Sequence, residues 1–192
     1  MSNPFWSDAA LEPKRKFRWL VYLAGMPQYI AKSVTKPAFN VGSSEHNFLQ
    51  HKFNFPGRLT WQDITLTIVD PITPDATVSL YNIIRNAGYE IPTDVNAVDG
   101  SGHRTISKAN MVSALGGEIS IAQIGIEGSA DNEIIEKWTL RNPQITSVTF
   151  DTLDYGSDEL LNITIGIKYD WALLNEGVTG PLPFTGAEYD RT

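Results

Sequence analysis

Residues 161–169 read LNITIGIKY, and this stretch decides the fold class. Every odd position from Leu161 to Tyr169 carries an apolar side chain, and every even position carries a small or polar one. A period of two is typical of a strand that buries one face. Residues 145–150 form a second extended stretch, and the Asp/Gly/Ser-rich segment 154–158 between the two favours a turn. The two stretches therefore predict an antiparallel hairpin.

Similar patterns of apolar side chains occur earlier in the chain. Further strands are expected at residues 17–23, 30–36, 64–68, 119–126 and 134–140. The apolar positions change parity near Ala122 and Gln123, which indicates a β-bulge. Most of the chain is therefore expected to form β-sheet.

One segment has a clear helical pattern. Thr73 is expected to cap it, Pro74 to occupy its first position and Gly88 to follow its end. Its apolar residues repeat at helical spacing and lie on one face, namely Leu80, Ile83, Ile84 and Ala87. Residues 106–115 allow a second, short helix. The pattern predicts a mainly β protein, an antiparallel β-sandwich or barrel with one flanking α-helix.

Composition excludes several classes of protein. The 192 residues fit one domain, and the absence of cysteine excludes disulfide frameworks, zinc ribbons and thiol nucleophiles. The longest apolar run has eight residues, against roughly 20 for a membrane-spanning helix. Residues 1–60 carry a net charge of +5 and residues 61–192 carry −12. Such asymmetry suits a self-complementary building block, although chance placement on a solvated surface gives the same sums.

Candidate catalytic residues do not form a recognisable site. His46 and His51 lie five residues apart in a segment without helical pattern, so they do not form a helical metal pair. Ser101 and His103 adjoin each other, but no third group and no strand-to-helix elbow accompany them. We therefore expect no enzymatic activity, no cofactor and no metal.

The aromatic residues of segment 45–58 are the most unusual feature. Phe48, Phe53 and Phe55 occur close together, while turn-forming residues stand only at the two ends of the segment. Three such rings would not normally be left in water. They either fold back on the core or pack against another molecule.

Residues 55–70 read FPGRLTWQDITLTIVD, in which a Gly-Arg pair and a Trp/Asp pair precede an alternating strand. This stretch resembles a segment of a known family, the tail tube proteins of contractile-tailed bacteriophages, in which a Gly-Arg turn and a Trp/Asp pair lead into such a strand. Residues 142–145, 150–158 and 161–171 resemble the closing hairpin of the same family. The opening strand at residues 17–21 and the helix after residue 74 follow the same order, so the resemblance covers most of residues 15–172.

The resemblance implies a structural protein whose hexameric rings stack into a hollow tube. Its expected partners are other copies of itself, the tail sheath, tape-measure, baseplate and tail terminator proteins, and DNA that passes through the lumen without specific binding. Its expected place is the virion, with assembly in the host cytoplasm. The implied organisation is an N-terminal arm (1–14), a tube domain (15–172) with an extended inter-ring loop (43–59), and a flexible tail (173–192).

Two sets of residues are assigned roles by these considerations. Ring-to-ring contact is expected from the first set, which is Phe48, Leu49, Phe53, Phe55 and Arg58. An acidic lumen would let DNA slide because it offers no cation to the phosphates. The candidates for that role are Glu118, Glu127, Glu133 and Glu136.

Three alternatives stay open. The chain could form a single junction or terminator ring, or the tube of a phage-like injection or secretion system. Outside this class, a monomeric β-barrel binding module would hold a ligand in a pocket.

Overall fold

The computed structural model describes residues 13–24, 26–90, 105–125 and 134–178. The elements in chain order are β1 (Trp19–Tyr22), η2 (Gln28–Ile30), β2 (Ala31–Val34), β3 (Phe39–Phe48), β4 (His51–Trp61), β5 (Ile64–Val69), α1 (Ala76–Asn86), α2 (Lys108–Ala114), β6 (Glu118–Ile124), β7 (Ile134–Arg141), β8 (Gln144–Phe150), β9 (Asn162–Lys168) and β10 (Trp171–Val178).

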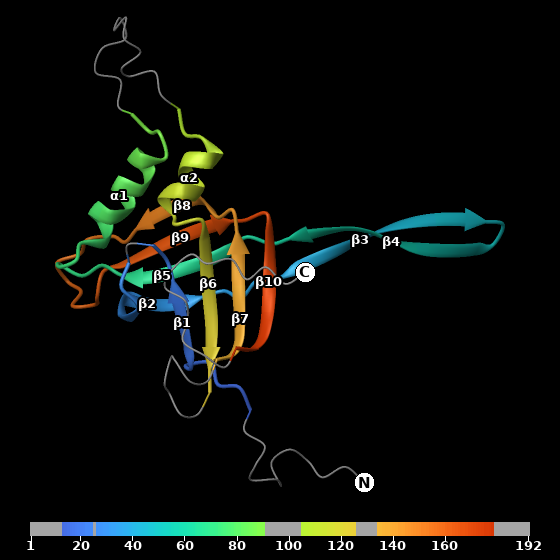
Figure 1. Cartoon of the computed structure of the whole chain (residues 1–192), viewed down its shortest axis with the longest axis horizontal. Coiled ribbons are helices and arrows are strands. Elements are labelled where there is room, and N and C mark those ends of the chain that lie inside the picture. The colour runs from blue at the N-terminus through green and yellow to red at the C-terminus, as the bar shows by residue number, and fades with distance from the viewer. Residues whose placement is uncertain (1–12, 25, 91–104, 126–133, 179–192) are drawn as a thin grey trace, which may run out of the picture.

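Two four-stranded sheets form the body of the molecule. Sheet 1 has the order β1-β6-β7-β10 and sheet 2 the order β2-β5-β9-β8, and all neighbouring strands are antiparallel. Figure 1 shows the strands of one sheet running across those of the other, with α1 and α2 side by side at one end. The predicted fold class, a mainly β antiparallel sandwich, is confirmed.

The core lies between the two sheets and under α1. Alternate residues of β5 and β9 point into it, and all six are almost fully buried: Ile64, Leu66, Ile68, Ile163, Ile165 and Ile167. The predicted hairpin of residues 145–150 with 161–169 is β8–β9, in which Ile145 lies opposite Ile167. The predicted bulge is also present, as a register shift between Gln123 and Ile124.

Helix α1 begins later than the sequence pattern indicates. Asp75, not Thr73, is the N-cap, because its carboxylate accepts the Val78 N–H at 2.9 Å. Asp70 at the end of β5 accepts the Ala76 N–H at 3.2 Å, so the two carboxylates together fix the first turn. Gly88 follows the helix with a φ of 114°, as expected for a residue past the C-cap.

Residues 171–178 contradict the predicted start of the flexible tail at residue 173. They form strand β10, which pairs with β7 from Trp171–Arg141 to Val178–Ile134. The sequence of β10 does not alternate apolar and polar side chains, so no period of two marks it. Residues 1–12 and 179–192 of the expected arm and tail lie outside the described residues.

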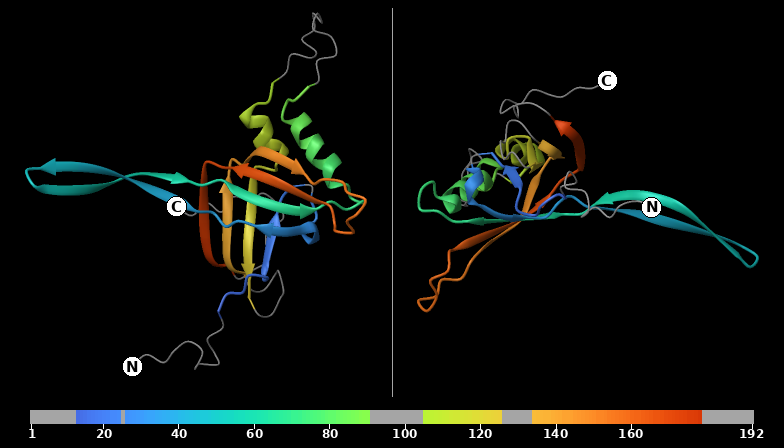
Figure 2. Two further views of the ribbon diagram at one scale, coloured as in Figure 1. Left: turned by 180° about the vertical axis from the view of Figure 1, so that it is seen from behind. Right: turned by 90° about the horizontal axis from the view of Figure 1, so that it is seen from below.

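The segment predicted as an extended loop at residues 43–59 is a β-hairpin. Strands β3 and β4 pair with each other and form a two-stranded sheet that projects away from the body (Figures 1 and 2). The predicted Gly-Arg turn at Gly57 and Arg58 is wrong. These two residues lie inside β4, opposite Gly42, where one extra residue on β4 makes a bulge. A bulge adjoining Pro56 tolerates the missing proline N–H without ending the strand.

Candidate assembly surface

The projecting hairpin is fixed to the body at its base. The rings of Phe39 and Trp61 meet edge to face with centroids 5.5 Å apart, and Trp61 lies 5.9 Å from the ring of Tyr169. The Gln62 N–H also donates to the Ala38 carbonyl at 2.8 Å. The near part of the hairpin is therefore held by packed aromatic side chains.

Beyond the bulge, the hairpin has two chemically different sides. Cross-strand neighbours share a side, and the pairs His46–Phe53, Phe48–His51 and Ser44–Phe55 lie on one of them. We call this side the aromatic face, defined as Phe48, Phe53 and Phe55 with His46 and His51. The opposite side carries the pairs Glu45–Asn54 and Asn47–Lys52, and Lys52 forms an ion pair with Glu45 at 2.7 Å.

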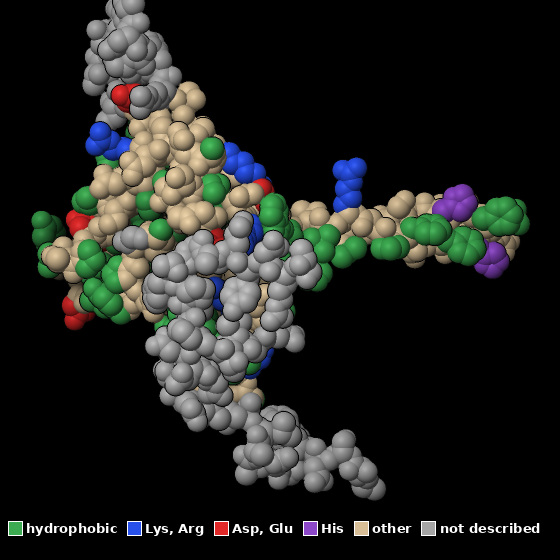
Figure 3. All heavy atoms as spheres, in the orientation of Figure 1, with side chains coloured by type: hydrophobic (Ala, Val, Ile, Leu, Met, Phe, Trp, Pro, Cys, Tyr) green, Lys and Arg blue, Asp and Glu red, His purple; other side chains and the backbone are tan. Residues whose placement is uncertain are grey.

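The aromatic face is open to solvent in the single chain. Phe48, Phe53 and Phe55 are 60%, 49% and 55% exposed, and they do not belong to the hydrophobic core. Figure 3 shows hydrophobic and histidine side chains gathered along the hairpin. Of the two possibilities left open by the sequence, folding back on the core is excluded. The rings remain available to another molecule.

The tip of the hairpin carries an apolar residue in an unfavourable conformation. Leu49 has a φ of 54° and is largely exposed. Left-handed backbone costs a residue with a Cβ about 1–2 kcal/mol, which glycine would avoid. A positive φ at this position is required by the two-residue turn between Phe48 and His51, and the contact of Leu49 with a partner stays a prediction.

At the bulge, two glycines that face each other are expected to differ in how well they tolerate a larger side chain. A Cβ on Gly57 would lie 3.0 Å from the carbonyl carbon of Gly42, whereas one on Gly42 would meet only Arg58 backbone atoms at 3.6 Å and beyond. We expect Gly57→Val to push the strands apart and to raise amide hydrogen exchange in β3 and β4 about tenfold, a cost of about 1.4 kcal/mol. Gly42→Val is the matched control and should raise exchange much less, because a Cβ at Gly42 meets its nearest atom at 3.6 Å. Equal exchange in the two variants would contradict the close approach of the strands.

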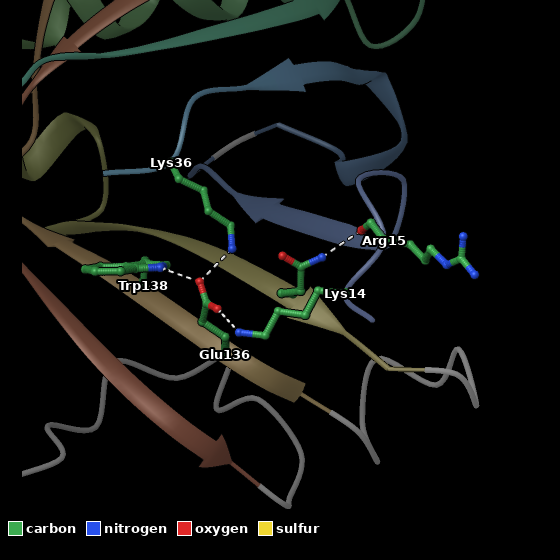
Figure 4. A network of polar contacts seen from close by, with 6 residues as sticks. Lys14, Arg15, Lys36, Glu136 and Trp138 are labelled. Atoms are coloured by element: carbon green, nitrogen blue, oxygen red, sulfur yellow. Dashed lines mark hydrogen bonds and ion pairs between the residues drawn. The ribbon is translucent and has the colours of Figure 1, made fainter. Parts of the chain in front are cut away.

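A second feature joins the hairpin base to the N-terminal segment. We call it the Glu136 cluster, and it consists of Glu136 on β7 with Lys14, Lys36 and Trp138 (Figure 4). One carboxylate oxygen binds Lys14, and the other accepts from Lys36 at 2.7 Å and from Trp138 Nε1 at 2.6 Å. Lys36 lies in the link between β2 and β3. The carboxylate therefore connects sheet 1, the N-terminal segment and the root of the hairpin.

The electrostatics of this cluster favour an ionised Glu136. Burial alone raises the pKa of Glu136, whose side chain is 12% exposed, but the hydrogen bonds from Lys14, Lys36 and Trp138 outweigh burial and lower the pKa to about 2. Beside it, the Gln123 side chain donates to the Arg15 carbonyl at 2.8 Å. The contacts fix the N-terminal segment across the end of sheet 1.

The four acidic lumen candidates have different outcomes. Glu136 has its charge balanced by two lysines, and its burial suits a structural role better than a channel surface. Glu118 is partly exposed and pairs with Arg141 at 2.9 Å, so it remains a lumen candidate, but the ion pair reduces the negative charge that it would present. Glu127 and Glu133 lie outside the described residues. A lumen role for Glu118 stays a prediction.

The inter-ring candidates are brought together in part. Phe48, Phe53 and Phe55 lie on one face of the hairpin, with Leu49 at its tip, whereas Arg58 lies apart from them in the bulge. Their contact with another ring stays a prediction. Sequence reasoning missed Lys14 and Lys36, because their ion pairs with Glu136 join residues 122 and 100 positions apart. It also missed the hydrogen bond of Trp138, although this residue lies only two positions from Glu136.

Chemical sites of other kinds find little support among the described residues. They contain no group of three or more His or acidic side chains that could hold a metal ion, and no helix long and apolar enough to cross a membrane. Ser101 and His103 lie outside them.

An open groove of about 450 Å³ lies between α1, α2 and β8. Its charged side chain, Lys108, is already bound to Asp170 at 2.6 Å, so the groove does not present it to a ligand.

Comparison with solved structures shows which known proteins share this fold. No family model matches the chain, and no curated protein sequence matches it significantly. Its fold is that of tube and terminator proteins of contractile injection systems, which are structural components. The resemblance to tail tube proteins is thereby confirmed at the level of the fold.

Three of the similar structures illustrate this likeness. A chain in the tube-terminating cap of the anti-feeding prophage (AFP) has a TM-score of 0.62 and 20% identity, covering 88% of this chain and 95% of that one. A chain in the sheath/tube terminator of the extracellular contractile injection system PVC has a TM-score of 0.62 and 18% identity, with coverages of 87% and 99%. A chain in the PVC sheath-tube complex has a TM-score of 0.60 and 17% identity, with coverages of 92% and 100%.

Proposed function

We propose that this chain is the subunit of the inner tube of a contractile phage tail. Copies close into hexameric rings, and the rings stack through their hairpins into a hollow tube that conducts DNA into the host. The observation that carries the proposal is the aromatic face, which lies beyond the core on a hairpin without a third strand. A second copy of the chain gives it a buried destination.

The edges of the two sheets support ring formation. Strands β1 and β10 end sheet 1, and β2 and β8 end sheet 2. Open edges present backbone groups that can pair with another chain, and a closed ring of sheets removes them. A similar chain occurs in the structure of the AFP baseplate, which was determined with sixfold symmetry. Six copies per ring accord with that symmetry.

The remaining partners of the chain follow from its proposed place in the tail tube. A sheath protein surrounds the tube, a baseplate and a terminator hold its ends, and a tape-measure protein occupies the lumen before DNA passes. In this arrangement Glu118 faces the lumen, where it neutralises the Arg141 guanidinium that would otherwise attract DNA phosphates. The chain carries out no catalysis, and it resides in the virion after assembly in the host cytoplasm.

A second candidate is a terminator ring, because two of the similar structures are a tube-terminating cap and a sheath/tube terminator. Such a protein forms one ring and does not polymerise. The tube of a phage-like injection system is a further form of the same function, with an effector in place of DNA.

Negative-stain electron microscopy of the purified chain, at low and high salt, separates these candidates. Open-ended tubes of uniform diameter are the result expected for a tube subunit. Isolated rings at every concentration would instead identify the terminator. Monomers that remain even when a preformed baseplate is added would overturn the proposal.

A further inference from the structure

A second exposed apolar region lies on the β8–β9 loop, residues 151–161. Leu153 and Leu160 are 84% and 69% exposed, and Tyr155 is fully exposed. Next to the loop, Ile72 in the β5–α1 turn is 97% exposed. The Asp70 N–H donates to the Leu161 carbonyl at 3.0 Å, so the turn and the loop emerge at the same end of sheet 2.

The loop is ordered and strongly acidic. Asp154 accepts the Gly156 N–H at 2.9 Å through its carboxylate and the Ser157 N–H at 3.3 Å through its carbonyl, which holds Tyr155 outward at a turn. Residues 151–161 contain four acidic side chains and no lysine or arginine. We call this region the acidic loop.

The acidic loop and the hairpin occupy opposite ends of the molecule. Strand β5 follows β4 directly, so the hairpin is rooted where β5 begins at Ile64, while β5 ends at Val69 opposite Asn162, where the acidic loop joins β9. Figures 1 and 2 show the hairpin and this loop pointing away from each other along the long axis. One chain therefore cannot bring its own two surfaces together.

The two surfaces complement each other in charge. Residues 39–61 contain one acidic and two basic side chains. Glu45 and Lys52 neutralise each other in their ion pair, so the net positive charge of the hairpin is that of Arg58, which lies in the bulge on the body side of the aromatic face. Its aromatic face adds two histidines, whose ring N–H groups can donate to carboxylates. Opposite charge beside exposed apolar groups favours association and fixes its orientation.

We propose that the acidic loop of one copy receives the aromatic face of a second copy. The inference rests on the proposed function, since it assigns the surface that each hairpin meets in the next ring. Leu153 and Tyr155 pack against the phenylalanine rings, and the loop carboxylates accept hydrogen bonds from the histidine rings of the same face. Because donor and acceptor lie at opposite ends, each filled acceptor leaves a free donor, and the contact propagates along the tube.

Cross-linking tests the contact directly, because the natural chain has no cysteine. One protein carries Gln50→Cys at the hairpin tip, and a second, differently tagged protein carries Ser157→Cys in the acidic loop. Both positions are exposed, and both substitutions preserve the apolar and charged residues of the contact. The proteins are mixed and treated with a short bismaleimide. The mixture should give at least ten times more mixed dimer than one in which Asn86→Cys, exposed at the far end of α1, replaces Ser157→Cys.

A second pair of measurements makes the outcome decisive. Adding Leu153→Ser and Tyr155→Ser to the loop protein should lower the cross-linked yield about tenfold, while its melting temperature stays unchanged. Equal yields at positions 157 and 86 would overturn the inference. Electron microscopy of the same samples separates the two proposals. Tubes that form without cross-linking would contradict only the proposed contact. Cross-linked chains that form neither rings nor tubes would contradict the tube function but support the contact.

Discussion

Replacing Phe48 and Phe53 with serine is expected to abolish tube formation and leave a folded protein. Burial of a phenylalanine side chain is worth about 1.5–3 kcal/mol, so the double variant loses about 3–6 kcal/mol for each hairpin that docks. Because each ring docks through six hairpins, the total loss of docking free energy is about six times larger, and the rings are expected not to stack. Electron microscopy gives the readout as the length and number of tubes under conditions in which the natural chain assembles.

The opposite side of the same hairpin provides the control. Asn47→Ser with Asn54→Ser alters the same two strands but keeps the aromatic face, and this variant should assemble normally. The melting temperatures of both variants should match that of the natural chain, because neither pair of residues belongs to the core. Tubes of normal length from the phenylalanine variant would show that the aromatic face does not hold the rings together.

Replacing Glu136 with glutamine is expected to lower the free energy of unfolding at pH 7 by about 1–3 kcal/mol. The shift of its pKa from 4.5 to about 2 sets an upper limit of about 3 kcal/mol, at 1.36 kcal/mol per pKa unit. The partly exposed lysines reduce this value, since solvent screens their charges. The amide preserves the size of the side chain and removes its charge.

The pH dependence follows from the direction of the shift. A carboxyl group whose pKa is lowered in the folded state stabilises the fold at pH values above the pKa that the group has in the unfolded chain. This contribution disappears as the pH falls from about 4.5 to about 2. The difference between natural and Glu136→Gln proteins in denaturant unfolding should therefore be full at pH 7 and vanish near pH 2. A difference that persists at pH 2 would contradict the ion-pair explanation.

Glu118→Gln serves as the matched acid-to-amide control. Its ion pair with Arg141 lies on the surface, where such pairs contribute about 0–1 kcal/mol. We expect a small loss at pH 7. An equal loss in the two variants would mean that the Glu136 cluster has no special role in tying the N-terminal segment and the hairpin root to sheet 1.

Local patterns predicted the sandwich well because its inner strands bury one face each. The alternation of β5 and β9, the bulge in the β6–β7 pair and the apolar face of α1 all follow from residues near one another in sequence. Strand β10 was missed because it carries apolar side chains on both parities. The start of α1 was misplaced because Thr73 followed by Pro74 matches the usual N-terminal pattern as well as Asp75 does, whereas the structure uses Asp75 as the N-cap.

The hairpin was harder to predict for a different reason. The turn at Leu49 and Gln50 contains no glycine, asparagine or aspartate, so no turn signal indicated that two strands meet there. Pro56 and Gly57 suggested a turn where the strand continues through a bulge. The aromatic residues were nevertheless recognised as unusual, because exposed rings conflict with the hydrophobic effect however the backbone runs. The two ion pairs of the Glu136 cluster join residues 100 and 122 positions apart and have no local sequence signal.

The isolation of the hairpin from the core has a kinetic consequence. A two-stranded ribbon without further packing is marginally stable in water, so the part beyond the bulge is expected to order fully only when it docks. Two free subunits must then meet the entropy of ordering a hairpin for a single docked pair, whereas an existing ring presents several acceptors held at fixed positions relative to one another. Growth from a template is therefore favoured over spontaneous nucleation, and the length of a polymer comes under the control of whatever starts it.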